Sequence, residues 1–212
     1  GEVGVDIYYY DIEKNVVQEK AFIPSTKSFA IAEEELGKMV YYNQDQNLLY
    51  ILAGGKFYKI DLTKDEQTVL AKNLEEGQYT VSADGHLIAY QTSGTINTAQ
   101  EIKVLNLKTD EENAVAAKSG EAIRPLGFIG SDFVYGYLRQ EDVGHTAAGG
   151  ELFPMYELEI RNSENEVMKT YSADQIYISD VFIEENMMTL NRVVKSGETY
   201  TVTSQDYISS NE

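Results

Sequence analysis

The titratable side chains best placed to bind a partner lie in one long stretch, from Arg139 to Pro154, that is poor in signals for regular structure. Within it, His145 carries an imidazole, a side chain that suits acid–base work or ligand contact. Long loops on a rigid scaffold commonly carry function, whereas an insertion without a role remains the alternative. The candidate binding residues are Arg139, Glu141, Asp142, His145 and Glu151.

Motifs for metals, cofactors and nucleophilic catalysis are incomplete in this sequence. Asn43, Asp45 and Asn47 alternate like the start of a calcium loop, but the required glycine and glutamate are replaced by Leu48 and Gly54. The second histidine, His86, belongs to a predicted turn, and no cysteine is present to complete a zinc site. Neither a phosphate-binding Gly-Lys-Ser/Thr motif nor a Gly-x-Ser-x-Gly elbow occurs. We therefore expect no metal, no cofactor and no hydrolase triad.

Carboxylates are abundant, and they are the one group that keeps an enzymatic alternative open. The chain has 35 Asp and Glu against 17 Lys and Arg, a net charge of −18. Two carboxylates about 5–10 Å apart in a cleft would suffice for a glycoside hydrolase. Most of the acids must cover a solvated surface, so we expect a protein without catalysis and keep the hydrolase as the alternative.

The same charge excludes several partners. A nucleic-acid-binding protein needs a basic face, and an anionic membrane surface repels a protein of net charge −18. No run of about 18 apolar residues indicates a membrane span. Without cysteine the chain has no disulfides. Its 16 Tyr and 7 Phe supply bulky core material, which argues against disorder.

The elements that must position these residues are short β-strands. Runs such as Phe57–Leu62 and Tyr200–Thr203 alternate with polar turn clusters, as in an all-β sandwich, barrel or propeller. Only Ser28–Met39 has the composition of a helix. The tyrosine runs at 8–10 and 41–42 could anchor a partner, but strand alternation predicts that part of each run is core.

Two internal repeats select among these architectures. The first repeat is a turn followed by two large apolar residues: Leu48-Leu49, Leu87-Ile88, Phe133-Val134 and Met187-Met188. The second is a hairpin with a polar turn of about four residues, which begins near Tyr10, Lys59, Val104 and Glu157. Two hairpins every 40–55 residues match the period of a four-stranded propeller blade. We therefore predict an all-β, β-propeller-like fold of about five four-stranded blades over residues 1–212 as a single domain.

One blade resembles a known repeat. The segment from Tyr79 to Tyr90, Tyr-Thr-Val-Ser-Ala-Asp-Gly-His-Leu-Ile-Ala-Tyr, is similar to the WD40-like β-propeller repeat of the TolB type, with Ala83 in place of that family's proline. The resemblance implies a propeller scaffold over most of the chain. It leaves the function open, because such repeats serve transport scaffolds, peptidase gates and surface proteins alike.

Closure of the ring is the least determined feature. The first hairpin, from Val5 to Phe22, lacks preceding strands, and the last unit lacks an obvious outermost strand because residues 205–212 are short and polar. The N-terminal strands would complete the last blade in a closed ring, since exposed edges invite aggregation; the alternative is an incomplete ring or a fragment of a larger propeller.

The propeller also places the candidate loops. The connections at residues 91–100 and 139–154 both follow the second strand of a blade, so they should share one rim. We expect a non-catalytic binding or scaffold domain that presents rim loops to a protein or a cell-surface glycan. The composition suits an extracytoplasmic or cell-surface domain whose signal or anchor lies outside this sequence, with no membrane insertion by this segment.

Overall fold

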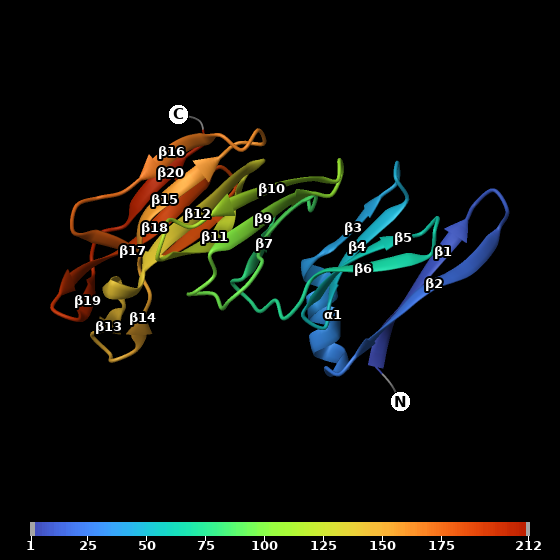
Figure 1. The fold of residues 1–212 in the computed structure, drawn as a ribbon, viewed down its shortest axis with the longest axis horizontal. Coiled ribbons are helices and arrows are strands. Elements are labelled where there is room, and N and C mark those ends of the chain that lie inside the picture. Colours follow the sequence, from blue (N-terminus) through green and yellow to red (C-terminus); the bar gives the residue numbers. More distant parts are fainter. Residues whose placement is uncertain (1–2, 211–212) are drawn as a thin grey trace. The chain divides into compact units, whose positions relative to one another are not determined.

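The computed structural model describes residues 3–210, which form an all-β protein with one α-helix (Figure 1). The chain divides into two compact units. Unit 1 contains the described residues up to Glu75 together with Leu107–Thr109, and unit 2 contains Glu76–Asn106 and the described residues from Asp110 onward. The prediction of a single domain over residues 1–212 stays a prediction.

Unit 1 is built from a four-stranded antiparallel sheet and a separate hairpin. The sheet has the order β3-β4-β5-β6, and the hairpin consists of β1 and β2. The bounds are β1 (Val3–Asp11), β2 (Val16–Ser25), β3 (Val40–Asn43), β4 (Leu48–Ala53), β5 (Lys56–Asp61) and β6 (Glu66–Ala71). Gly54 and Gly55 join β4 to β5 with positive φ angles, as a tight hairpin turn requires.

The core of unit 1 lies between the hairpin and the sheet. Ile7 and Ile23 of the hairpin pack with Ile51, Tyr58 and Ile60 of the sheet. The predicted helical segment is confirmed as α1 (Phe29–Lys38), which begins after Ser28. Leu36 of α1 packs against the same core. The core therefore joins the hairpin to a sheet with which it shares no strand pairing in the described residues.

Unit 2 begins with a second four-stranded antiparallel sheet. Its order is β10-β9-β8-β7, so consecutive strands are neighbours, as in β3–β6. The bounds are β7 (Tyr79–Val81), β8 (Leu87–Gln91), β9 (Glu101–Asn106) and β10 (Glu111–Ala116). Two such meanders are the sheets that the propeller prediction requires.

The rest of unit 2 is a ten-stranded sheet made of two strand groups. In the first, β11, β12, β15 and β16 pair consecutively; in the second, β17 and β18 pair and β18 then pairs both β19 and β20. A single residue pair, Met155 with Ile178, connects the groups. The bounds are β11 (Glu121–Ile129), β12 (Asp132–Arg139), β13 (Gly144–Thr146), β14 (Glu151–Leu152), β15 (Met155–Arg161), β16 (Val167–Tyr171), β17 (Ile176–Glu184), β18 (Met187–Ser196), β19 (Thr199–Val202) and β20 (Asp206–Ser209).

The group β11-β12-β15 is covered on both faces. On one face, Phe133, Tyr135 and Tyr137 pack with Leu87 and Ile102 of the sheet β7–β10. On the other face, residues such as Val134, Leu138 and Leu158 pack with Met188 and Leu190 of β18. Layers of sheets packed face to face are typical of propeller blades, and the number of blades stays a prediction.

The sequence repeat has a structural counterpart in the hairpin turns. Asn15, Asp65, Asp110 and Asn165 occupy corresponding turn positions with φ angles of 51, 56, 63 and 62°. Asparagine and aspartate tolerate this left-handed conformation better than other residues with a side chain. The recurrence of Asp or Asn at these places therefore follows from backbone geometry.

The apolar pairs of the first repeat stand at or near the start of β4, β8, β12 and β18, and the equivalence of the four units stays a prediction. Seven of the eight side chains are buried or half-buried, but Met187 is 51% exposed. Strand β20 pairs with β18, so residues 206–209 do form a strand of the last unit. No strand within residues 3–210 pairs with the other edge of β20, which agrees with the expectation that this unit lacks an outermost strand. Within residues 3–210, none of the helices has the length and apolar character of a membrane span.

Candidate functional site

Aromatic side chains run along one face of β12, in unit 2. Strand alternation puts Phe133, Tyr135, Tyr137 and Arg139 on this face. The ring centroids of Phe133 and Tyr135 lie 5.3 Å apart, and those of Tyr135 and Tyr137 lie 5.7 Å apart. Because Tyr135 and Tyr137 are buried, the row is a rigid support for the groups beside it.

Strand β15 adds charged side chains to that face. Glu157 lies opposite Tyr137, and Glu159 lies opposite Tyr135. The Tyr137 hydroxyl donates to Glu159 Oε2 at 3.1 Å, and the Tyr135 hydroxyl donates to the same oxygen. Arg161 Nε in turn donates to the Tyr135 hydroxyl at 2.5 Å. The name ladder is used below for a set of nine residues on this face: Lys118, Glu121, Tyr135, Tyr137, Arg139, Tyr156, Glu157, Glu159 and Arg161.

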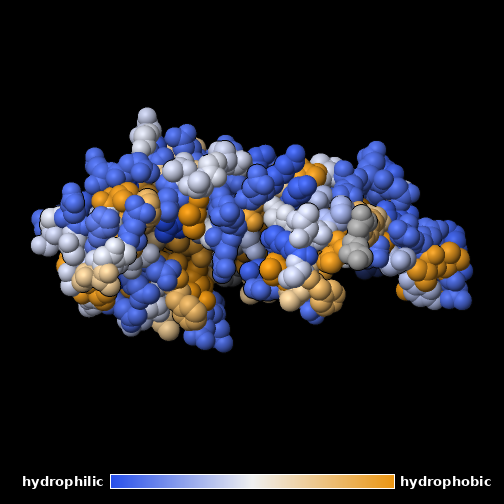
Figure 2. All heavy atoms as spheres, turned by 90° about the horizontal axis from the view of Figure 1, so that it is seen from below, coloured by the Kyte–Doolittle hydropathy of each residue, from blue (hydrophilic) through white to orange (hydrophobic). Residues whose placement is uncertain are grey.

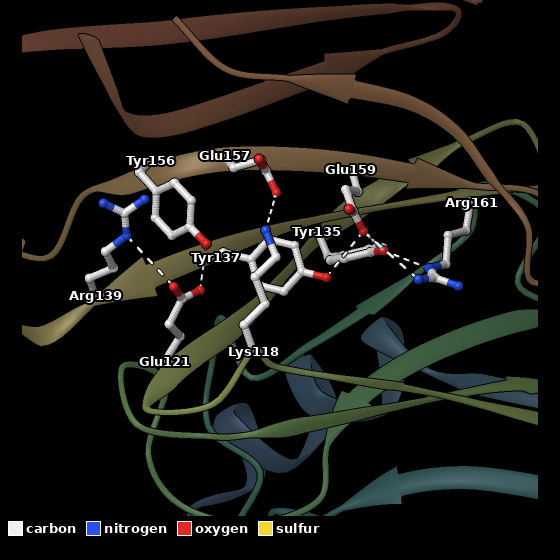
Figure 3. Close-up of polar contacts among 9 residues, drawn as sticks. All are labelled: Lys118, Glu121, Tyr135, Tyr137, Arg139, Tyr156, Glu157, Glu159 and Arg161. Atoms are coloured by element: carbon white, nitrogen blue, oxygen red, sulfur yellow. Dashed lines mark hydrogen bonds and ion pairs between the residues drawn. The ribbon is translucent and has the colours of Figure 1, made fainter. Parts of the chain in front are cut away.

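The other end of the ladder, which we call its open end, includes the partly exposed side chains of Lys118 and Arg139, and Figure 3 draws their contacts. Lys118 Nζ lies 2.5 Å from Glu157 Oε1 and 5.5 Å from the centroid of the Tyr156 ring. The guanidinium carbon of Arg139 lies 3.6 Å from the same centroid. Glu121 receives the Tyr156 hydroxyl at 2.5 Å and lies 3.6 Å from Arg139 Nε. Cations therefore flank Tyr156, and each cation has a carboxylate partner.

The electrostatics keep the ladder's donors protonated at neutral pH. Burial raises the pKa of the Tyr137 phenol, and the charge on Glu159 adds to the effect. Burial likewise raises the pKa of Tyr156, together with its hydrogen bond to Glu121. Burial lowers the pKa of Lys118, but the bonds to Glu157 and Tyr156 outweigh it and the net pKa is raised. The ladder thus offers phenol, ammonium and guanidinium donors beside carboxylate acceptors.

The two predicted rim loops lie together beside the open end of the ladder. Gln140 Nε2 donates to the Asn97 carbonyl at 3.3 Å, which connects residues 139–154 with residues 91–100. The Arg124 guanidinium donates to the Asn97 side chain and to the Phe153 carbonyl, the latter at 3.5 Å. Burial lowers the pKa of Arg124. These bonds fix both loops to β11.

The five predicted site residues do not form one cluster. Arg139 belongs to the ladder, whereas Asp142 is buried beneath the loop. Tyr177 donates to Asp142 Oδ1 at 3.2 Å, and the Tyr200 hydroxyl donates to the Asp142 carbonyl at 2.5 Å. Asp142 Oδ2 has no hydrogen-bond partner among the described residues. Asp142 therefore connects the loop to Tyr177 and Tyr200, and it is not exposed to a binding partner.

His145, Glu141 and Glu151 are the exposed members of the predicted set. His145 in β13 lies opposite Glu151 in β14, and Glu141 lies in a short 3₁₀ helix, η1 (Gln140–Asp142). The expectation of a stretch without regular structure is wrong for residues 144–146 and 151–152, because β13 pairs with β14 and, in parallel, with β19. The His145 amide also donates to the Glu198 carbonyl at 2.9 Å. The hairpin β13–β14 is therefore part of the ten-stranded sheet, which it joins through β19.

Sequence reasoning missed most of the ladder, although a signal was present. Alternate positions of β12 read Phe133, Tyr135, Tyr137, Arg139, and alternate positions of β15 read Glu157, Glu159, Arg161. Period-two alternation places each set on one face of its strand. Only the pairing of β12 with β15 brings the two sets together.

The described part of the chain holds no group of three or more His, Asp or Glu side chains arranged to bind an ion.

Comparisons with known proteins leave the family open. No family model matches the chain, and no curated protein sequence matches it significantly. Among solved structures, the chain is similar to hydrazine synthase of Kuenenia stuttgartiensis, with a TM-score of 0.43, 12% identity and 97% of this chain covered. It is also similar to a protein from Lactobacillus plantarum (TM-score 0.35, 9% identity, 96% covered) and to a putative TolB from Agrobacterium tumefaciens (0.32, 9%, 97%).

The matched structures differ in length from this chain. It spans 57% of the hydrazine synthase chain, 64% of the Lactobacillus protein and 90% of the putative TolB. At these TM-scores the similarities carry no argument about activity, so function must be argued from the site.

Proposed function

We propose that this chain is a non-catalytic binding domain whose surface in unit 2 takes a partner at the two rim loops and the open end of the ladder. The observation that carries the proposal is the anchoring of both loops, at residues 91–100 and 139–154, to Arg124. A surface fixed before binding loses little conformational entropy when a partner arrives.

The chemistry of the surface favours a cell-surface glycan. Lys118 and Arg139 keep 47% and 39% of their side chains exposed beside Tyr156. Sugar hydroxyls pair with both the donors and the acceptors of such a cluster. Cations and carboxylates are balanced in this cluster, so it suits a neutral polyhydroxylated ligand. A protein partner is the alternative.

The glycoside hydrolase alternative receives less support. Hydrolysis requires two carboxylates that face a bound sugar, one of which donates a proton. Glu121, Glu157 and Glu159 each accept a hydrogen bond from a neighbouring phenol or ammonium group. These contacts occupy the carboxylates as acceptors, which suits ligand positioning better than proton transfer.

The scaffold and location follow as part of the same proposal. We take the four-stranded meanders and the hairpin repeat to be blades of a TolB-type propeller of about five blades, in an extracytoplasmic or cell-surface protein. A reporter fusion to the natural protein, assayed on both sides of the membrane, tests the location.

The binding proposal is tested with a glycan array and with capture from a native cell-surface extract. The variant Glu141→Ala/His145→Ala/Glu151→Ala changes exposed loop side chains without touching buried Asp142. We expect it to lose at least tenfold in affinity for the captured glycan at an unchanged melting temperature. The control, Glu164→Ala/Glu184→Ala/Asn186→Ala, removes two carboxylates and a neutral polar group from exposed positions in or next to turns elsewhere in unit 2.

Equal binding by both variants would remove the loop from the site. Capture of a protein in place of a glycan, lost in the loop variant alone, would support the surface and reject the glycan. Release of reducing sugar from a bound glycan would establish the hydrolase alternative.

A further inference from the structure

Strand β1, in unit 1, has a partner on one side only. Within residues 3–210 it pairs with β2, and no other strand joins that sheet. The opposite edge of β1 therefore presents backbone N–H and C=O groups that a further strand can use.

The internal repeat identifies what belongs at this edge. Asp11 Oδ1 accepts the Lys14 amide at 3.0 Å, and Asp61 Oδ1 accepts the Lys64 amide at 2.9 Å. The β-bulge also falls at the same place, between Ile7 and Tyr8 in β1 and between Phe57 and Tyr58 in β5. The hairpin β1–β2 is thus equivalent to β5–β6.

Every equivalent of β1 has an antiparallel strand on that edge. β4 pairs with β5, β8 pairs with β9, and β12 pairs with β15. In β5 the paired residues include all those from Phe57 to Asp61, which correspond to residues 7–11 of β1. A strand antiparallel to residues 7–11 would complete the same arrangement.

A groove runs along this edge. Its volume is about 570 Å³, which lies within the range of sites that bind ligands. Consecutive residues of β1 and its turn, Ile7 to Glu13, line it, as expected for a groove along a strand edge. The facing wall includes Tyr42 and Leu49, so an incoming strand needs apolar side chains on that side.

Side chains that the repeat buries elsewhere are exposed here. Ile12 is 80% exposed, whereas its equivalent Leu62 is 6% exposed; Tyr10 is 52% exposed, whereas its equivalent Ile60 is 1% exposed. Figure 2 shows apolar residues over the tip of this hairpin. By contrast, the free edge strands β6 and β10 begin with acidic residues, Glu66 and Glu111, which oppose strand addition.

We propose that this edge binds an extended strand of a partner polypeptide by β-addition, antiparallel to residues 7–11 and apolar toward Tyr42 and Leu49. Main-chain hydrogen bonds to β1 supply affinity, and the apolar wall selects the sequence. This site lies in unit 1 and is independent of the surface assigned above in unit 2.

The test uses the whole chain and a peptide that carries the β4 sequence, Leu48–Ala53, between solubilising lysines. A scrambled peptide with the same lysines controls for attraction to the acidic protein. Two further peptides are N-methylated, one at residues 48, 50 and 52 and the other at 49, 51 and 53. In a strand, alternate amides point to the same edge, so one methylated set should bind at least tenfold more weakly and the other within about threefold.

Hydrogen exchange locates the peptide, and two variants test the wall. We expect slower exchange in β1 and weaker binding by Tyr42→Ala, with no change for Tyr207→Ala, an exposed tyrosine of unit 2. Equal binding of the scrambled peptide, insensitivity to both methylated sets, or protection of another edge would overturn the proposal. If β1 were protected from hydrogen exchange without peptide, and if this protection disappeared when the protein was diluted, the edge would be occupied by a second copy of this chain. That result would also overturn the proposal.

Discussion

The guanidinium carbon of Arg139 lies 3.6 Å from the centroid of the Tyr156 ring, and Glu121 contacts both side chains. Arg139 ends β12, whereas Tyr156 follows the excursion through β13 and β14 at the start of β15. The stacked pair therefore closes the base of the loop excursion and joins it to the ladder.

We predict that Arg139 and Tyr156 are energetically coupled. A double-mutant cycle with Arg139→Ala and Tyr156→Leu should give a coupling energy of about 0.5–1 kcal/mol in chemical denaturation, the usual size for a partly exposed cation–π pair. The matched pair Lys195 and Tyr200, at 5.6 Å, should couple more weakly. Additive losses at Arg139 and Tyr156 would show that the stacking carries no energy.

Two glycines of the β13–β14 hairpin, Gly144 at the start of β13 and Gly150 in the turn before β14, should respond differently to an added methyl group. A Cβ at Gly144 would meet the Glu198 carbonyl at 2.5 Å, whereas one at Gly150 meets only Thr146 Oγ1 at 3.4 Å. Gly144→Ala should cost about 1–3 kcal/mol, as overpacking does. Gly150→Ala should lie within about 0.5 kcal/mol of wild type. Equal melting temperatures would mean that β13 does not pack on β19.

The two adjacent methionines of the last apolar pair should differ sharply in how much their replacement by alanine destabilises the protein. Met188 is fully buried and Met187 is 51% exposed. Met188→Ala should destabilise the protein by about 2–5 kcal/mol, and Met187→Ala by less than about 0.5 kcal/mol. Urea unfolding measures both; a large loss at Met187 would show that this side chain is covered in solution.

Stability should fall at alkaline pH because of the buried tyrosines. Burial raises the pKa of Tyr90 to about 12, whereas tyrosine in the unfolded chain titrates near pH 10. The folded state therefore keeps its proton while the unfolded state loses one, so this contribution is complete below about pH 10 and is lost as pH rises toward 12. Tyr90→Phe should show a shallower decline in melting temperature over this window, with tyrosinate absorbance as the second readout.

Moderate salt should raise the melting temperature. A net charge of −18 destabilises the compact state through self-repulsion, and salt screens it. A melting temperature that stays flat or falls between low and physiological ionic strength would show that pairs such as Lys20 with Asp65, at 2.9 Å, outweigh the overall field.

Much of the fold is predictable from the sequence, because its signals are local. Asp65 and Asn165 have positive φ angles, which their residue types tolerate without help from distant contacts. The apolar pair Leu87-Ile88 indicates a strand from the residues next to it in the sequence. The internal repeat then links these local units into four-stranded sheets, two of which the structure contains intact.

Only the tertiary structure decided which side chains meet. Asp142 and His145 lie three residues apart, yet one is buried under Tyr200 and the other is exposed, because β13 pairs with a strand more than fifty residues later. The stack of Arg139 on Tyr156 depends equally on the register shift between Tyr137 and Leu138. Such contacts arise from long-range strand pairing, whose register no local pattern along the chain contains.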